Sequence, residues 1–168
     1  GISLVGPEYE TIALMGSNLG MKSIEDVAYL NEQCNELGMD TISLGGVLGF
    51  AVEAYEKGII SKFDLNNIDI GWGKAVEIGK LIHDIAYRNG KVPSLLAEGV
   101  KIAADKLGKK SERFAVHAHG LEIPGYDPRG TFGMGLAYAT SDRGGCHQRA
   151  WTVVNEIHNP EFERFSFE

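Results

Sequence analysis

Residues 41–58, TISLGGVLGFAVEAYEKG, constrain the fold most, because they are apolar on nearly every face until Glu53. A helix that is apolar all round is a buried helix, whereas a surface helix keeps one polar face. The β-branched residues of the run also permit two short strands, but its length and its polar end favour a helix. We therefore predict a buried helix that starts at Asp40 or Thr41 and ends at Gly58.

Three glycines interrupt this apolar run at Gly45, Gly46 and Gly49, on adjacent turns of the predicted helix. Each glycine inside a helix costs about 1 kcal/mol relative to alanine. We therefore expect other parts of the chain to pack very close to this face of the helix.

Three further segments with helical periodicity fill the first part of the chain, at residues 23–38, 74–90 and 94–108. Ser23 can cap the first helix, with Asp26 at its third position, and Gly38 supplies a left-handed stop. From Phe114 the helical period disappears. There we predict a short strand or extended segment, followed by a helix near Met134. The chain is thus mainly α, a multihelical domain over which a long Gly-rich irregular segment, residues 120–145, folds back.

Composition excludes several classes of function. The 168 residues carry a net charge of −7, which argues against a nucleic-acid or anionic-membrane surface. No apolar run approaches the roughly 20 residues that span a bilayer, and the first residues do not form a signal peptide pattern. Two cysteines are too few for a disulfide framework, so we expect a cytoplasmic protein.

The Gly-rich strings GLEIPGYDPRG (120–130) and RGGCH (143–147) are the best candidates for a binding segment. Glycine lets the backbone approach a bulky polar ligand and present its N–H and C=O groups, and Arg129 and Arg143 add forked donors. A long structural loop, with Pro124 and Pro128 fixing turns, explains the composition equally well. Glu8 and Glu10 follow a proline and, on their own, suit the start of a helix.

Nine strings taken together in order resemble the tungsten-containing aldehyde:ferredoxin oxidoreductase family. They are GPEYET, GSNLG, LNEQCNELGMDTISLGG, AYEKGII, WG, LIHDIAYRNG, LLAEGVK, FAVHAHGLEIPGYDPRG and GLAYATSDRGGCH. The resemblance implies a fragment of a larger multidomain enzyme, cut at both ends. Residues 1–110 would be the helical domain with the first pterin-binding motif, and residues 111–168 the Gly-rich pocket segment and the start of the next helical domain.

The resemblance also implies cofactors and partners. The parent would hold tungsten or molybdenum between two pterins, and a [4Fe–4S] cluster would pass electrons from a small aldehyde substrate to ferredoxin. The cluster cysteines of the family have no counterparts here, so we assign no metal ligand to Cys34 or Cys146. The isolated chain, without the remaining domains, is expected to bind no cofactor and to be inactive.

By the same resemblance, individual residues acquire roles. The pterin-binding pattern Asp-x-x-Gly-Leu-Asp/Cys matches Asn35, Gly38, Met39 and Asp40, with Asn in place of Asp and Met in place of Leu. A neutral Asn makes a weaker contact than a charged Asp. Catalytic proton handling falls to Glu10 of GPEYET and His147 of RGGCH, and Tyr9 and Tyr126 are expected in the substrate pocket.

Two alternative functions stay open. The tungsten subunit of a benzoyl-CoA reductase belongs to the same family and reduces an aromatic ring. The second alternative is a helical module that binds a ligand or metal without redox chemistry. In an extended strand, His117 and His119 share one face and could ligate a metal with Cys146 and His147.

Overall fold

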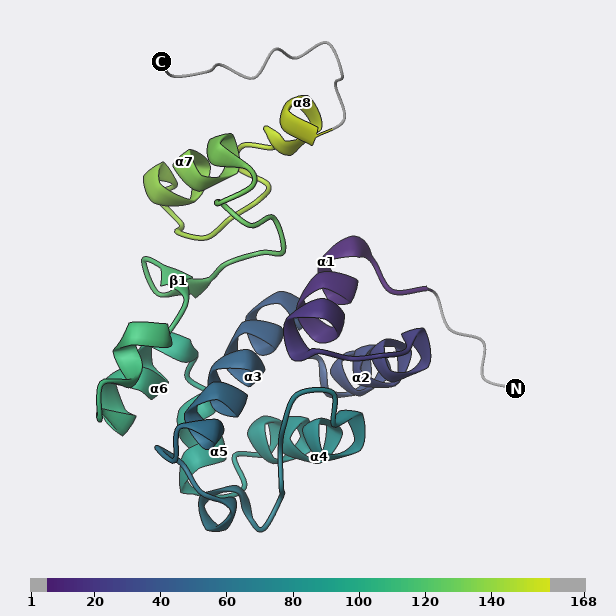
Figure 1. Ribbon diagram of the computed structural model, residues 1–168, viewed down its shortest axis with the longest axis vertical. Coiled ribbons are helices and arrows are strands. Elements are labelled where there is room, and N and C mark those ends of the chain that lie inside the picture. The colour runs from purple at the N-terminus through teal and green to yellow at the C-terminus, as the bar shows by residue number, and fades with distance from the viewer. Residues whose placement is uncertain (1–5, 158–168) are drawn as a thin grey trace.

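The computed structural model describes residues 6–157 and is mainly α, as predicted (Figure 1). Expectations for residues 1–5 and 158–168 lie outside the described residues. The elements are α1 (Tyr9–Thr11), η1 (Ile12–Gly16), η2 (Ser17–Leu19), α2 (Ile24–Leu37), α3 (Thr41–Glu56), η3 (Lys62–Leu65), α4 (Ala75–Ala86), α5 (Lys91–Leu96), α6 (Val100–Leu107), η4 (Ser111–Phe114), β1 (His117–Ala118), β2 (Leu121–Glu122), α7 (Phe132–Thr140) and α8 (Val153–Ile157). Among these described helices, no single one has the length and hydropathy needed to cross a membrane.

Helix α3 is the buried centre of the molecule, which confirms the prediction of one helix rather than two strands. It begins at the N-cap Asp40, whose Oδ2 accepts a hydrogen bond of 2.7 Å from the Ser43 N–H. Figure 1 shows α3 in the middle of the main body, with α1, α2, α4, α5 and α6 around it. Most of its residues from Leu44 to Ala54 are buried, so the hydrophobic core forms around this helix.

The glycines of α3 are sites of close packing, as predicted. A Cβ atom on Gly45 would lie 2.6 Å from Leu14 Cβ, and one on Gly46 would lie 2.9 Å from Glu122 Cγ. A Cβ atom on Gly49 would lie 3.0 Å from the Nδ2 atom of Asn18. The bare face of α3 therefore receives η1 and η2 on one side and the β-hairpin on the other.

Helix α2 begins and ends where the sequence indicates. The Ser23 side chain accepts a hydrogen bond of 3.1 Å from the Asp26 N–H, and Gly38 ends the helix with a φ angle of 65°. Helix α4 also forms within its predicted segment. The main core joins α2, α3, α4, α5 and α6 in one buried hydrophobic cluster.

The prediction of one helix over residues 94–108 is wrong. The segment forms two helices, and the first begins at Lys91 rather than at Ser94. The break falls at Gly99, which has a φ angle of 89°. The Val100 N–H that follows donates a hydrogen bond of 2.7 Å to Glu122 Oε1, so a distant carboxylate caps α6.

The first part of the Gly-rich segment, up to Gly125, folds back over the helices as predicted, whereas α7, which also lies within residues 120–145, packs in a separate cluster. Strands β1 and β2 form a short antiparallel hairpin in which His117 pairs with Glu122. Glu122 is only 4% exposed and packs against Gly46 of α3. The Gly145 N–H donates to the Ala118 carbonyl, so the RGGCH string lies against the hairpin.

A second, smaller hydrophobic cluster forms beyond the hairpin, at the end of the molecule that carries α7 and α8 (Figure 1). It contains Met134 and Tyr138 of α7 and Val153 of α8, with Ile123 and Tyr126 packed against it. Helix α7 forms near Met134, where the sequence predicts it. The division of the chain at residues 110 and 111 stays a prediction.

Substitution of Gly45 by alanine should destabilise the fold, because the added methyl group would meet the backbone of Leu14 at 2.9 Å. We expect Gly45→Ala to lower the free energy of unfolding by about 1–3 kcal/mol, the usual effect of overpacking. Gly49→Ala is the matched control on the same helix. Its methyl group meets no backbone atom, only the end of the Asn18 side chain at 3.0 Å, so the roughly 1 kcal/mol gained in helix propensity offsets much of the strain. Urea unfolding of both variants measures the difference, and equal destabilisation would contradict this account.

Candidate functional site

Glu10 lies in the first turn of α1 and is held by the Gly-rich segment. Its Oε2 atom accepts a hydrogen bond of 2.6 Å from the Gly125 N–H, 115 positions along the chain. Its Oε1 atom is buried and is, within residues 6–157, the one buried side-chain oxygen or nitrogen without a hydrogen-bond partner. An unpaired buried oxygen is costly, so this atom is a candidate ligand- or proton-binding group.

The surroundings of Glu10 favour its protonated form. Burial raises the pKa of this carboxyl above its ordinary value, and the charge of Asp40 acts in the same direction. The Gly125 N–H and His147 lower the pKa and so oppose this shift in part. Glu10 therefore takes up and releases a proton at higher pH than an ordinary glutamate.

Close packing explains why the segment needs a glycine at position 125. A Cβ atom there would overlap Ala13 Cβ and would lie 3.2 Å from Glu10 Oε2. Only a residue without a side chain lets the backbone come near enough for its N–H to reach the carboxylate.

Three rings form a row beside Glu10. Tyr9 stacks on Tyr126 with ring centroids 4.7 Å apart, and the Tyr126 ring lies 6.4 Å from that of His147 in a tilted arrangement. The Tyr9 hydroxyl donates to the Gly125 carbonyl at 3.4 Å. The structure thus brings Tyr9, Tyr126 and His147 together around Glu10, although they come from three separate segments.

The segment matched to the pterin pattern forms the turn between α2 and α3. The Gly38 N–H donates to the Asn35 carbonyl, and the Met39 N–H donates to the Cys34 carbonyl at 2.8 Å. No atom lies within 4 Å of a Cβ built on Gly38, so its left-handed backbone is what requires glycine here. Asn35 and Gly38 are exposed, whereas the Met39 side chain packs against the core.

Asp40 and His147 share one cavity of about 190 Å³. Its other lining residues are Ile42, Ser43, Leu121, Glu122, Pro124, Arg143, Gly145, Cys146 and Gln148. A hydrogen bond of 2.9 Å between the Thr11 and Thr41 hydroxyls ties the start of α3 to the helical stretch that carries Glu10. The cavity has a mixed lining, in which Asp40 offers a carboxylate and Arg143 a guanidinium beside apolar side chains such as Leu121. Asn35, Gly38 and Met39 do not line it.

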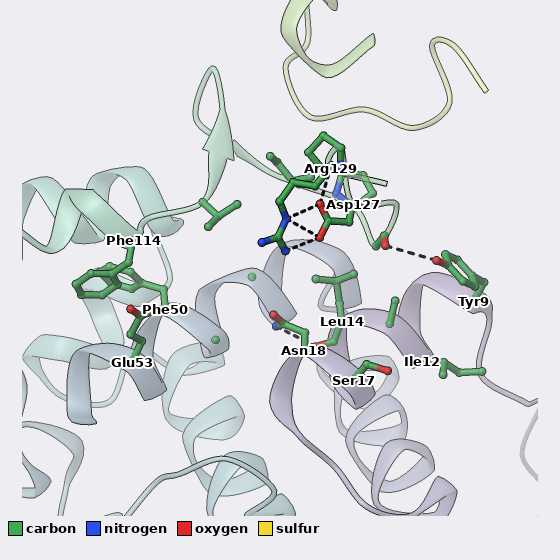
Figure 2. A pocket seen from close by; sticks show the side chains of 18 of the residues that line it. Tyr9, Ile12, Leu14, Ser17, Asn18, Phe50, Glu53, Phe114, Asp127 and Arg129 are labelled. Carbon is green, nitrogen blue, oxygen red and sulfur yellow. Dashed lines mark hydrogen bonds and ion pairs between the residues drawn. The ribbon is translucent and has the colours of Figure 1, made fainter. Parts of the chain in front are cut away.

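A larger cavity of about 780 Å³ lies on the other side of Pro124, and Figure 2 shows the side chains around it. Gly46 and Gly49 of α3 are among its lining residues. Phe50, Phe114 and Tyr9 contribute aromatic walls. The Arg129 guanidinium at its rim is bound to Asp127, with Nε 3.0 Å from both carboxylate oxygens. Arg129, one of the two arginine donors expected from the Gly-rich segment, is thus already paired with Asp127 of the same turn.

The proposed set of metal ligands does not assemble. In the part of the chain that the structure describes, no group of three or more His, Cys, Asp or Glu side chains lies close enough to hold a metal ion. His117 accepts a hydrogen bond from the Gly120 N–H through its Nδ1 atom, and His119 is exposed. The hypothesis of a metal-binding module therefore has no site in this region.

Two residues of this region were missed from the sequence. Glu122 is buried at the cavity that Asp40 and His147 share, and Tyr138 is buried behind Tyr126. An acidic residue between Leu121 and Ile123 is the kind of signal that can reveal a buried carboxylate. Tyr138 lies in an apolar helix, where nothing distinguishes it from an ordinary core residue.

The chain is similar to known enzymes over nearly its whole length. It is 42% identical over 153 residues to a tungsten-containing aldehyde ferredoxin oxidoreductase of Thermococcus kodakarensis, and equally to one of Pyrococcus furiosus. In both cases the match covers 90% of this chain and 25% of the relative, so the chain spans about a quarter of the length of these curated relatives.

The same fold occurs in a solved structure described as "Active site complex BamBC of Benzoyl Coenzyme A reductase in complex with 1,5 Dienoyl-CoA". The two chains superpose with a TM-score of 0.67 at 22% sequence identity, over 84% of this chain and 22% of the other. At this identity the likeness shows a shared fold.

A family model provides the third comparison. The model described as "Aldehyde ferredoxin oxidoreductase, domains 2 & 3" matches residues 2–168. Together with the identity to the two archaeal enzymes, this match shows that the chain belongs to the aldehyde ferredoxin oxidoreductase family.

Proposed function

We propose that this chain is part of a tungstopterin iron–sulfur oxidoreductase that oxidises aldehydes to carboxylic acids, with ferredoxin as the electron acceptor. The observation that carries the proposal is the buried, unpaired Oε1 atom of Glu10, which lies in the electrostatic field of both His147 and Asp40. Membership of the family and the tungsten-containing relatives support the same reaction.

Residues at the cavity that Asp40 and His147 share suit a pterin cofactor. A pterin ring is rich in N–H donors, and Asp40 offers a carboxylate acceptor in the cavity wall. Asn35 and Gly38 are exposed at the turn before Asp40, so the Asn35 side chain and the Gly38 backbone can contact a ligand bound next to this turn. The Met39 side chain packs against the core, so Met39 would contribute only its backbone. When bound, the tungsten bis-pterin would supply the two-electron acceptor and the [4Fe–4S] cluster the single-electron path to ferredoxin.

Conversion of an aldehyde and a water molecule to a carboxylic acid releases two protons and two electrons. Glu10 is suited to take one of these protons. Because Oε2 accepts the Gly125 N–H, a proton on this carboxyl binds at Oε1. In the ionised state the same oxygen can orient or deprotonate the attacking water or the hydrated aldehyde.

His147 can bind the aldehyde oxygen. Its ring is only partly exposed and faces Tyr126, so its position is restrained. An imidazole can donate a hydrogen bond to a carbonyl and can change its charge near neutral pH. Tyr9 and Tyr126 would then form the wall that keeps the substrate between His147 and Glu10.

Replacement of Glu10 by glutamine should abolish most of the activity. The assay uses an enzyme that contains this chain and is as long as the relatives. In it we expect Glu10→Gln to lower kcat by about 10²–10⁴-fold. A base must be ionised, so activity of the parent enzyme should fall as pH drops through the raised pKa of Glu10, and the variant should lack this acidic limb. Viologen reduction with an aldehyde measures both effects. Glu8→Gln, an exposed neighbour, is the matched control, and a normal kcat in Glu10→Gln would refute the role.

Replacement of His147 by glutamine tests the second group. We expect kcat/KM to fall by about tenfold or more through loss of a hydrogen bond to the transition state. Since His147 lowers the pKa of Glu10, its removal should also move the acidic limb to higher pH. His119→Gln, which changes an exposed histidine outside the site, should alter neither. An unmoved acidic limb in His147→Gln would contradict the pairing of these two residues.

The isolated 168-residue chain is expected to bind no tungsten and to be inactive. The chain spans about a quarter of the length of its relatives, so it offers only part of the protein that would enclose the two pterins. Metal analysis of the purified chain and an assay for aldehyde-dependent viologen reduction test this expectation. Stoichiometric tungsten or measurable turnover would contradict it.

A further inference from the structure

Three consecutive residues, Pro124 to Tyr126, are held between two parts of the molecule. On one side, Glu10 Oε2 accepts the Gly125 N–H at 2.6 Å. On the other side, the hydroxyl of Tyr138 in α7 donates a hydrogen bond of 3.1 Å to the Tyr126 carbonyl. Side chains of α1 and α7 thus hold the same short stretch of backbone from opposite ends.

The Tyr138 side chain is suited to a structural donor rather than to proton transfer. It is 2% exposed and packs with Met134 and Val153 in the second hydrophobic cluster. Burial raises the pKa of its hydroxyl, and the charges of Glu10 and the neighbouring tyrosines act in the same direction. The hydroxyl therefore stays protonated and keeps donating across the working pH range.

Gly125 has the greatest backbone freedom of the three residues from Pro124 to Tyr126. The proline ring fixes the φ angle of Pro124, whereas a glycine tolerates almost any backbone conformation. With the Tyr126 carbonyl released, the long 3.4 Å hydrogen bond from the Tyr9 hydroxyl to the Gly125 carbonyl is left to oppose a rotation at Gly125 that moves its N–H away from Glu10 Oε2. The hydrogen bond from Tyr138 is thus the contact that restricts this rotation from the side of α7.

We propose that Tyr138 is a positioning residue for Glu10, acting through the Tyr126 carbonyl and the Gly125 N–H. By the same contact it keeps the Tyr126 ring between Tyr9 and His147. The inference rests on the proposed function of Glu10 as the catalytic base, and it assigns a role to a residue that touches neither substrate nor cofactor.

The sign of the effect on Glu10 follows from its surroundings. The Gly125 N–H lowers the pKa of Glu10, so loss of this hydrogen bond raises that pKa further. The other titratable groups that act on Glu10 or on Tyr138 are Asp40 at the start of α3, His147 after α7, Tyr9 of α1, and Tyr126 and Asp127 of the Gly-rich segment. The substitution Tyr138→Phe leaves all of these in the chain.

The test introduces Tyr138→Phe into an enzyme that contains this chain and is as long as the relatives. We expect the acidic limb of the kcat/KM profile to move upward by about 0.5–1 pH unit. Carbodiimide labelling of protonated carboxyls, quantified at Glu10 by peptide mass spectrometry, should show the same upward shift in protein without cofactor. Tyr55→Phe is the matched control, because it removes a hydroxyl that donates to Asp69, outside this site. It should shift neither profile.

The possible results separate the two proposals. A Tyr138→Phe enzyme that loses activity while both pH profiles stay in place would overturn the positioning role, since simple destabilisation lowers the amount of active enzyme without moving a pKa. Full activity in Glu10→Gln would instead overturn the proposed function. In that case the labelling profile of Glu10 still decides whether Tyr138 controls its pKa.

Discussion

The close approach of other segments to the bare face of α3 is the contact on which the rest of the structure depends. Leu14 meets Gly45 and Glu122 meets Gly46 at distances that leave no space for a side chain. Leu14 belongs to the helical stretch that carries Glu10, and Glu122 belongs to the hairpin that leads to Gly125. One helix face therefore sets the separation between the two segments that build the candidate site.

This packing places a carboxylate where water does not reach all of it. Glu10 obtains one hydrogen bond from the Gly125 N–H, and its other oxygen stays buried without a protein partner. Such an arrangement costs stability, because a buried polar atom that loses water gains nothing in return. Proteins tolerate this cost mainly at sites where a ligand or a reaction uses the free atom. The free Oε1 atom of Glu10 and the neighbouring rings of Tyr9, Tyr126 and His147 therefore form the centre of the proposed chemistry.

Sequence patterns predicted the helices well where local signals decide them. Ser23 and Gly38 bound α2, and the apolar run after Asp40 forms α3. The failure at residues 94–108 has a physical cause, because Gly99 breaks the helix where the distant Glu122 carboxylate caps the next one. No local pattern contains that contact. The same holds for Tyr138, whose partner is a backbone carbonyl in another segment.

Patterns in the sequence are enough to show that the chain is mainly α, that one helix is buried with close neighbours, and that the motifs match one enzyme family. These properties depend on periodicity, capping and residue identity, all of which are local. Tertiary packing was needed to bring Asp40 and His147 near enough to act on Glu10 and to place the Gly125 N–H at its carboxylate. Electrostatic fields and hydrogen bonds depend on distances in space, and packing sets those distances between residues more than a hundred positions apart.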